Sequence, residues 1–222
     1  MRKFKQGIQK VKLIAYKETS PQPIDNLWSF CGAFIGIAAI GMLQQLFYHL
    51  EREDQLFLIG AFGASSVLLF SASNSPLAQP RNTLFGGILS ALVGVLTYKI
   101  FYLEEFIWLS PALSVALAIL VMQYTKTLHP PGGAIALIAN IGSEEIKEMG
   151  FLYVLNPIFT GLMVLLLVAL LFNNISKNRI YPYRDVNIRK LSYFEKLFKW
   201  KVKHSDWIFT RSTHSEKLKK KG

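Results

Sequence analysis

The sequence predicts an all-α protein, a polytopic membrane helical bundle of about six spans. Of the 222 residues, 51% are hydrophobic, and the mean hydropathy is +0.30. Apolar segments recur at lengths close to the roughly 20 residues that cross a bilayer. Charge separates three parts: residues 1–26 hold six Lys/Arg and two acids, residues 27–173 five and eight, and residues 174–222 fourteen and four. We therefore expect a basic amphipathic N-terminal segment, a transmembrane domain and a basic cytoplasmic tail.

Two of the six predicted spans are short, the second and the fifth. If these two are re-entrant, the count falls to four. A full helix, a short Gly-rich segment and a full helix occur twice in succession, which permits a 3+3 inverted repeat of the kind found in many transporters. The six segments are 27–48, 56–72, 84–101, 106–124, 130–142 and 151–172.

The distribution of charge also predicts orientation and partners. Both tails are basic, and the connectors after the first, third and fifth segments are acidic. Lys/Arg bias places both termini in the cytoplasm, so we expect a multi-pass protein of the cell (inner) membrane. Apolar residues at helical spacing in the tails suggest contact with anionic lipid headgroups, although solvated tails are an alternative for the last stretch. Nucleic acid is not an expected partner, whereas a homo-oligomer is compatible with the sequence.

The stretch 127–134 contains the most unusual residues of the chain. Pro130 and Pro131 suit the first turn of a helix, and Gly132 and Gly133 permit close approach of a ligand. First-turn N–H groups without partners, at the positive end of the helix dipole, would bind an anion, and His129 could donate a hydrogen bond or carry a proton. The alternative is a helix cap at the membrane interface whose histidine contacts headgroups.

Two further groups of polar residues are candidates for the same site. Ser65 and Ser66 lie in the short second segment, where they could line a polar path or simply allow close helix packing. Gln79, Arg81 and Asn82 lie between the second and third segments. A guanidinium suits planar oxyanions, but an arginine on the cytoplasmic side is also what the topology requires.

Enzymatic chemistry finds no support in the sequence. It contains no metal-ligand spacing, no nucleophile with a base and no phosphate-binding loop, and its one cysteine, Cys31, lies inside the first span. We therefore expect neither an enzyme nor a bound cofactor or metal.

The tripeptide His129-Pro130-Pro131 and its surroundings resemble the HPP family of integral membrane proteins. The resemblance covers residues from about 25 to 183 and implies a bacterial or organellar membrane protein. Some members of the family in cyanobacteria and plastids are linked to nitrite transport, and members are usually described with four spans. The motifs that carry the resemblance are residues 63–70, 75–82, 90–95, 127–134 and 150–157.

These observations lead to two hypotheses of function. The first is a carrier or facilitator of a small anion, with nitrite suggested by the resemblance, in which His129, the N–H groups after Pro131, and Arg81 bind the substrate. The alternative is a membrane anchor or sensor that transports nothing and whose basic tails bind lipid or a partner.

Overall fold

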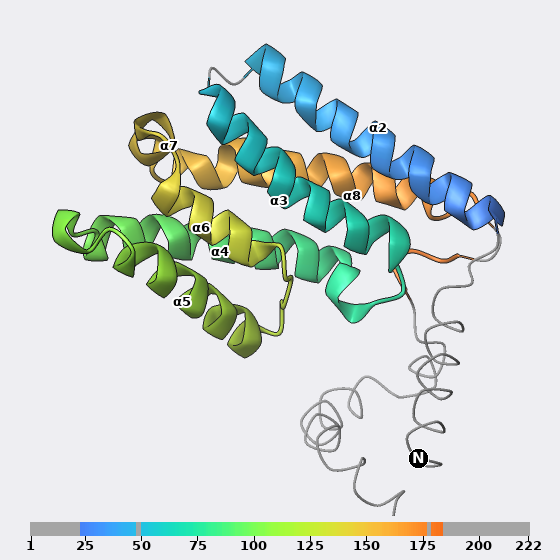
Figure 1. Cartoon of the computed structure of the whole chain (residues 1–222). Coiled ribbons are helices and arrows are strands. Elements are labelled where there is room, and N and C mark those ends of the chain that lie inside the picture. Colours follow the sequence, from blue (N-terminus) through green and yellow to red (C-terminus); the bar gives the residue numbers. More distant parts are fainter. Residues whose placement is uncertain (1–22, 48–49, 177–178, 184–222) are drawn as a thin grey trace, which may run out of the picture. The chain divides into compact units, whose positions relative to one another are not determined.

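A computed structural model describes residues 23–47, 50–176 and 179–183, and all secondary structure in these residues is helical (Figure 1). The predicted all-α bundle is therefore confirmed. Six apolar helices make up the bundle: α2 (Pro23–Phe47), α3 (Arg52–Ser71), α4 (Pro80–Phe101), α5 (Leu109–Thr125), α6 (Gly132–Ile141) and α8 (Thr160–Phe172). The connectors contain α7 (Glu144–Met149), the short 3₁₀ turns η1 (Pro76–Ala78) and η2 (Glu104–Phe106), and the π-helical η3 (Val154–Phe159), which leads into α8.

Four helical segments in the described part of the chain are long and apolar enough to cross a membrane: Pro23–Leu46, Arg52–Ser71, Pro80–Phe101 and Val154–Phe172. The prediction of a short second segment is wrong, because α3 has 20 residues and includes the polar residues that follow Glu51. The fifth segment is short as predicted, since α6 has 10 residues, and α5 is also below span length at 17.

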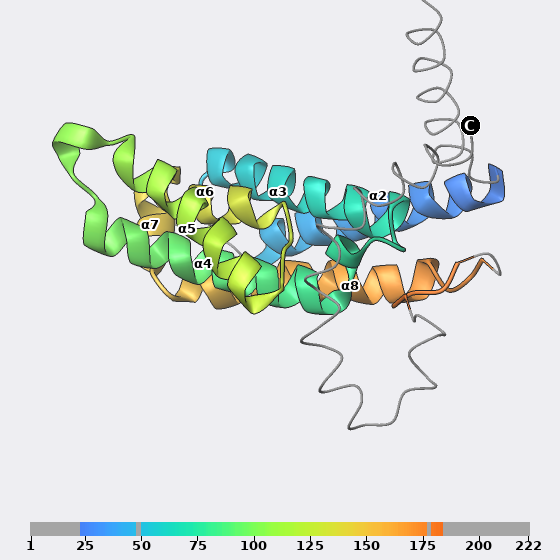
Figure 2. The same ribbon diagram turned by 90° about the horizontal axis from the view of Figure 1, so that it is seen from below.

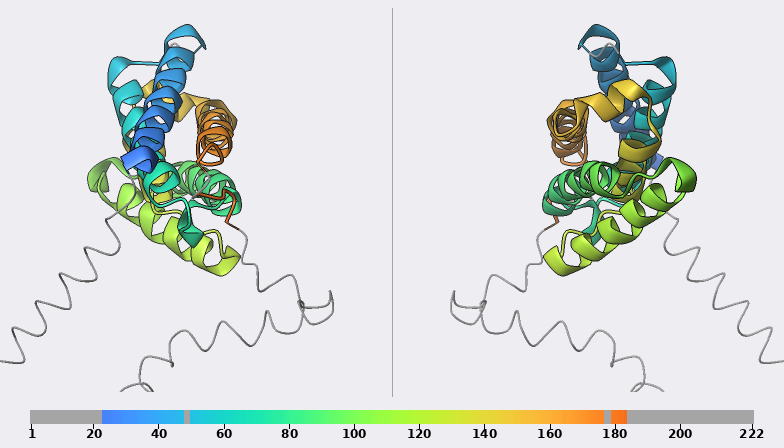
Figure 3. Two further views of the ribbon diagram at one scale, coloured as in Figure 1. Left: turned by 90° about the vertical axis from the view of Figure 1, so that its right-hand side faces the viewer. Right: turned by 90° about the vertical axis from the view of Figure 1, so that its left-hand side faces the viewer.

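The six apolar helices run roughly antiparallel to one another in chain order (Figure 1). Helices α2 and α5 lie on opposite sides of the bundle when it is viewed from either end (Figure 3). Helix α2 packs against α3 and α8, and α5 packs against α6 and α4 (Figure 2). Helix α3 also contacts α8, as α6 contacts α4, and the remaining main contacts are α3 with α6 and α4 with α8. If α2 is exchanged with α5, α3 with α6, and α4 with α8, each of these contacts becomes another contact of the same set. The predicted inverted repeat would produce this relation.

The core of the bundle is built from α3, α4, α6 and α8. Phe62, Tyr153 and Leu162 are fully buried there, whereas α2 carries exposed Phe30 and Phe34 on its outer side. Large apolar side chains are also exposed on α3, α4, α5 and α8, as expected where lipid replaces water around the bundle.

The two ends of the bundle differ in their connectors, and we call them the η1 end and the α7 end. At the η1 end, Ser176 donates to Asp25, and Arg179 Nη1 donates to Ser29 Oγ at 2.8 Å and to the Phe70 carbonyl at 3.1 Å. The start of α2 and the segment after α8 therefore lie at the same end.

The segment after α8 belongs to the bundle as far as Tyr183, nine residues past the predicted start of the tail at 174. Tyr181 is 2% exposed and donates its hydroxyl to the Ala78 carbonyl at 2.7 Å. Burial raises the pKa of Tyr181, so its phenol remains a neutral donor. The predicted amphipathic tails fall almost entirely in residues 1–22 and 184–222, outside the described residues.

Candidate functional site

The imidazole of His129 lies in the interior of the bundle and joins the two segments that the sequence singled out. His129 has no exposed surface. Its Nε2 lies 3.0 Å from Ser65 Oγ on α3, and its Nδ1 lies 3.3 Å from the carbonyl oxygen of Leu77 in η1. The alternative of a histidine that contacts headgroups at the interface is thus not what the structure shows.

The chain between α5 and α6 reaches the interior because α4 offers it a surface of small residues. A Cβ atom added to Gly86 would meet the Thr127 carbonyl oxygen and, at 2.8 Å, the Cβ of His129. Asn82 Nδ2 donates to the Leu128 carbonyl at 2.9 Å, which fixes the loop one residue before His129. These contacts hold the loop on α4 and aim the imidazole toward α3.

The backbone N–H groups after the two prolines differ from the prediction. The Gly132 N–H donates to the His129 carbonyl at 2.8 Å, and the Gly133 N–H donates to the Pro130 carbonyl at 3.1 Å. The Ile135 N–H bonds to the Pro131 carbonyl. The chain winds in a tight turn before α6, so carbonyls of the turn occupy the donors that were expected to be free for an anion. An anion could use them only if this turn opened.

The polar residues between α3 and α4 mostly hold loops. Gln79 donates to the Ser73 and Ser75 carbonyls and accepts from the Tyr183 N–H. Arg81 is exposed and donates to the Thr125 carbonyl at 3.1 Å, so it caps the last turn of α5. Both residues therefore have structural roles here, and the hydrogen bonds of the His129 ring go to other described residues.

Ser65 and Ser66 are both buried on α3. Ser65 Oγ also lies 3.2 Å from the Ala61 carbonyl one turn earlier, so its hydroxyl has two neighbours that can accept its hydrogen. The glycines of this stretch do not serve close packing within the bundle, because no described atom lies within 4 Å of a Cβ built on Gly60 or Gly63.

Sequence reasoning missed several neighbours of His129. Met122 Sδ lies 3.5 Å from the His129 backbone nitrogen and 3.4 Å from Ser90 Oγ. A Cβ on Gly132 would meet both Met122 and Ser90, so glycine is needed at this crossing. Helical spacing could have indicated that Met122 and Ser90 face inward, but not that they meet the loop before α6.

A second buried polar cluster lies between α4, α5 and α6. Asn140 Nδ2 donates to the Gly94 carbonyl at 3.0 Å and to the Ala136 carbonyl at 3.1 Å, and its Oδ1 accepts from Ser110. All polar atoms of this amide are satisfied, so the cluster serves packing. Within the residues that the structure describes, no group of three His, Cys, Asp or Glu side chains could hold a metal ion.

The apolar helices and the enclosed polar site define the chain as a multi-pass helical membrane protein. Residues 18–182 match the family model described as "HPP, transmembrane region". The chain belongs to the HPP family, as the sequence resemblance indicated.

Two transmembrane proteins of Dictyostelium discoideum are similar to this chain. One is 43% identical over 157 residues, which cover 70% of this chain and 49% of the relative. The other is 39% identical over 197 residues, which cover 82% of this chain and 67% of the relative. The chain thus spans about half the length of the first relative and two thirds of the second. None of the solved structures matches the chain.

Proposed function

We propose that this protein is a carrier or facilitator that moves a small anion, such as nitrite, across the membrane, and that His129 lies at the binding position. The observation that carries this proposal is the buried imidazole between α3 and η1. A buried ionisable side chain inside a membrane bundle is costly and marks a functional site by default. The family membership supports nitrite as the first substrate to test.

The hydrogen bonds of His129 are compatible with a proton that accompanies the anion. A carbonyl only accepts, so Nδ1 donates to Leu77 in either state of the ring. In the neutral ring, Nε2 accepts from the Ser65 hydroxyl; in the protonated ring, Nε2 donates to Ser65, which then donates to the Ala61 carbonyl. The ring can therefore gain or lose a proton without leaving any of these atoms unsatisfied.

The site is closed in this structure, and this fits a carrier in an occluded state. The ring nitrogens and the Gly132 and Gly133 N–H groups all have partners within the protein. An anion would have to displace the Leu77 carbonyl from His129 Nδ1 or open the turn before α6. Arg81 lies in the first turn of α4, at the η1 end of the bundle. Exchange of protein hydrogen bonds for substrate hydrogen bonds costs little net free energy.

Uptake of isotopically labelled nitrite into proteoliposomes tests the proposal. We expect wild-type uptake above that of empty vesicles and a loss of roughly tenfold or more in His129→Ala, because a ligand contact worth about 1.4 kcal/mol is lost. Ser65→Ala should also reduce uptake, whereas Ser71→Ala, an exposed serine on the same helix, should not.

Wild-type uptake equal to that of empty vesicles would contradict a nitrite carrier. Uptake by His129→Ala equal to that of the wild type would contradict a binding position at His129. The anchor or sensor hypothesis depends on tails outside the described residues. It predicts instead that deletion of residues 188–222 abolishes function and that His129→Ala leaves function intact.

A further inference from the structure

Gln44 on α2 is a buried amide that, among the described residues, has no hydrogen-bond partner. Gln44 is 1% exposed, and neither its Nε2 nor its Oε1 makes a hydrogen bond to any residue that the structure describes. The amides of Asn140 and Asn173, buried in the same bundle, both donate to backbone carbonyls. An unsatisfied buried polar group costs about 1–3 kcal/mol, and an apolar side chain of the same size would avoid that cost. The amide is therefore best explained by something that binds it.

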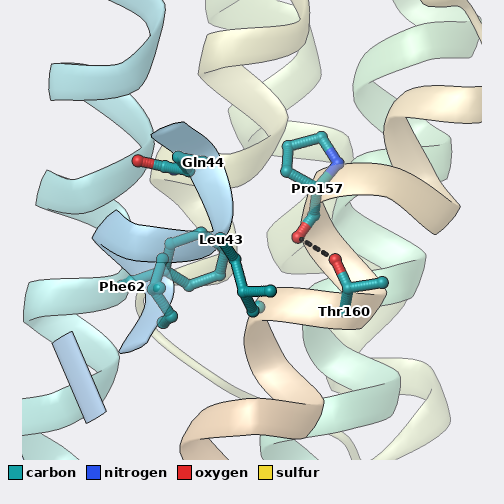
Figure 4. Close-up of a pocket in the computed structure, with 7 residues that line it drawn as sticks. Leu43, Gln44, Phe62, Pro157 and Thr160 are labelled. Carbon is teal, nitrogen blue, oxygen red and sulfur yellow. Dashed lines mark hydrogen bonds between the residues drawn. The ribbon is translucent and has the colours of Figure 1, made fainter. Parts of the chain in front are cut away.

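Gln44 lines a pocket between α2, α3 and the break that precedes α8 (Figure 4). In this structure the space between these residues is too narrow to hold a water molecule, so a bound ion requires the pocket to widen. Helix geometry fails beside the pocket at Asn156, whose φ and ψ are −132° and 106°. The hydroxyl of Thr160 donates to the Pro157 carbonyl at 3.2 Å at one wall, so the pocket has polar groups on two sides. The other lining residues are apolar: Ile40, Leu43, Phe62 and Gly161.

Gln44 corresponds to Met122, a neighbour of His129, when the two halves of the bundle are exchanged. Gln44 lies three residues before the last residue of α2, and Met122 lies three residues before the last residue of α5. Met122 contacts Ser90 of α4, and Gln44 shares its pocket with Thr160 of α8, the helix that takes the place of α4. Gln44 and Met122 thus occupy equivalent positions toward opposite ends of the bundle.

Helix α3 connects the two sites. Phe62 lines the Gln44 pocket, and Ser65, less than one turn further along α3, contacts His129. The ring of Phe62 is fully buried and packs on Gly161, where an added Cβ would overlap it. Phe62 and Ser65 therefore place a wall of the pocket and a partner of His129 on neighbouring turns of one helix.

We propose that the Gln44 pocket is a second binding position for the substrate, on the α7 side of Phe62, and that it takes a small oxyanion of the nitrite type. This inference rests on the proposed function. The amide N–H₂ group donates to the anion, and a water carried with the anion donates to Oε1, so both unsatisfied atoms gain partners.

The lining of the pocket supports a transient position and not a tight one. It contains no cation, so the anion is held by neutral hydrogen bonds and leaves readily, as conduction through successive sites requires. Because the amide is covered in this structure, binding needs a displacement of side chains that line the pocket.

The test compares Gln44→Leu with Gln45→Leu, its exposed neighbour on α2. In proteoliposomes, Gln44→Leu should raise the apparent KM for nitrite uptake roughly 3- to 10-fold, the effect of one lost neutral hydrogen bond. In nitrite-free detergent its Tm should equal or exceed that of the wild type, because the unsatisfied amide is gone. Gln45→Leu should match the wild type in KM.

Three results would overturn the second position while leaving the carrier intact: an unchanged KM in Gln44→Leu, the same rise in KM in Gln45→Leu, or a Tm of Gln44→Leu several degrees below that of the wild type. The last result would mean that Gln44 has a structural partner. Absence of nitrite uptake by the wild type would overturn the proposed function and this inference together.

Discussion

Gly86 on α4 lies against the backbone of the segment that carries His129. An added methyl group would overlap the Thr127 carbonyl oxygen and press on the His129 Cβ. We expect Gly86→Ala to lower the free energy of unfolding by about 1–3 kcal/mol, the usual cost of overpacking, and to reduce nitrite uptake because the imidazole moves.

Gly63→Ala provides the matched control for Gly86→Ala. No described atom lies within 4 Å of a Cβ at Gly63, which is also inside a helix. Alanine there should be neutral or stabilising by about 0.5–1 kcal/mol. Denaturant unfolding of both variants in one detergent checks the pair, and equal stability of the two variants would contradict the tight contact at Gly86.

Single residues also show what the sequence could and could not predict about the site. His129 was identifiable because it stands beside two prolines and two glycines, whereas Ser65 was a candidate that close helix packing explained equally well. Their contact joins residues 64 positions apart, and the bond from His129 to Leu77 joins residues 52 apart. Local spacing contains no information on such pairs. The local sequence also predicted that the N–H groups of Gly132 and Gly133 have no partners, whereas both donate to carbonyls of the turn before α6.

Among the elements, α3 and α7 are joined by one buried carboxylate. Asp54, in the first turn of α3, is 1% exposed and accepts from both the backbone N–H and the hydroxyl of Ser143, the residue before α7. The bond to the backbone measures 3.0 Å. Asp54 thus fixes the junction of α6 and α7 on α3, and its negative charge lies at the positive end of α7.

Replacement of Asp54 by alanine should therefore destabilise the bundle. We expect Asp54→Ala to reduce the free energy of unfolding by about 2–3 kcal/mol, because two hydrogen bonds to a charged group are lost. Glu53→Ala, at an exposed neighbouring position, should change it by less than about 0.5 kcal/mol. Chemical denaturation in micelles measures both values, and similar losses in the two variants would contradict a specific role of Asp54.

Element lengths illustrate a second limit of the sequence. Hydropathy started the second segment at residue 56, because Arg52, Glu53 and Asp54 are charged. In the structure these residues form the first turn of α3, where Asp54 accepts a hydrogen bond from Ser143, the residue before α7. The hydrogen bond that permits charged residues at the start of α3 joins residues 89 positions apart, so hydropathy along the chain does not predict it. Helix α6 was predicted well, because Pro131 and Gly142 bound it in the sequence itself.

At the scale of the whole molecule, the bundle consists of two halves with equivalent helix contacts. The sequence suggested this only through the repeated order of long and short segments. The contacts of α2 with α3 and α8, matched by those of α5 with α6 and α4, appear only in three dimensions. On this arrangement Gln44 and Met122, the neighbour of His129, occupy corresponding positions in the last turns of α2 and α5, toward opposite ends of the bundle.

The central claim is that a small anion binds at His129 inside the bundle. The chain has four histidines, so solid-state ¹⁵N NMR of histidine-labelled protein in liposomes can follow the His129 ring, identified by its loss in His129→Ala. We predict that nitrite shifts the His129 ring signals in a saturable manner and that chloride at the same concentration does not. Ring signals of His129 that stay constant at nitrite concentrations that saturate uptake would contradict the claim.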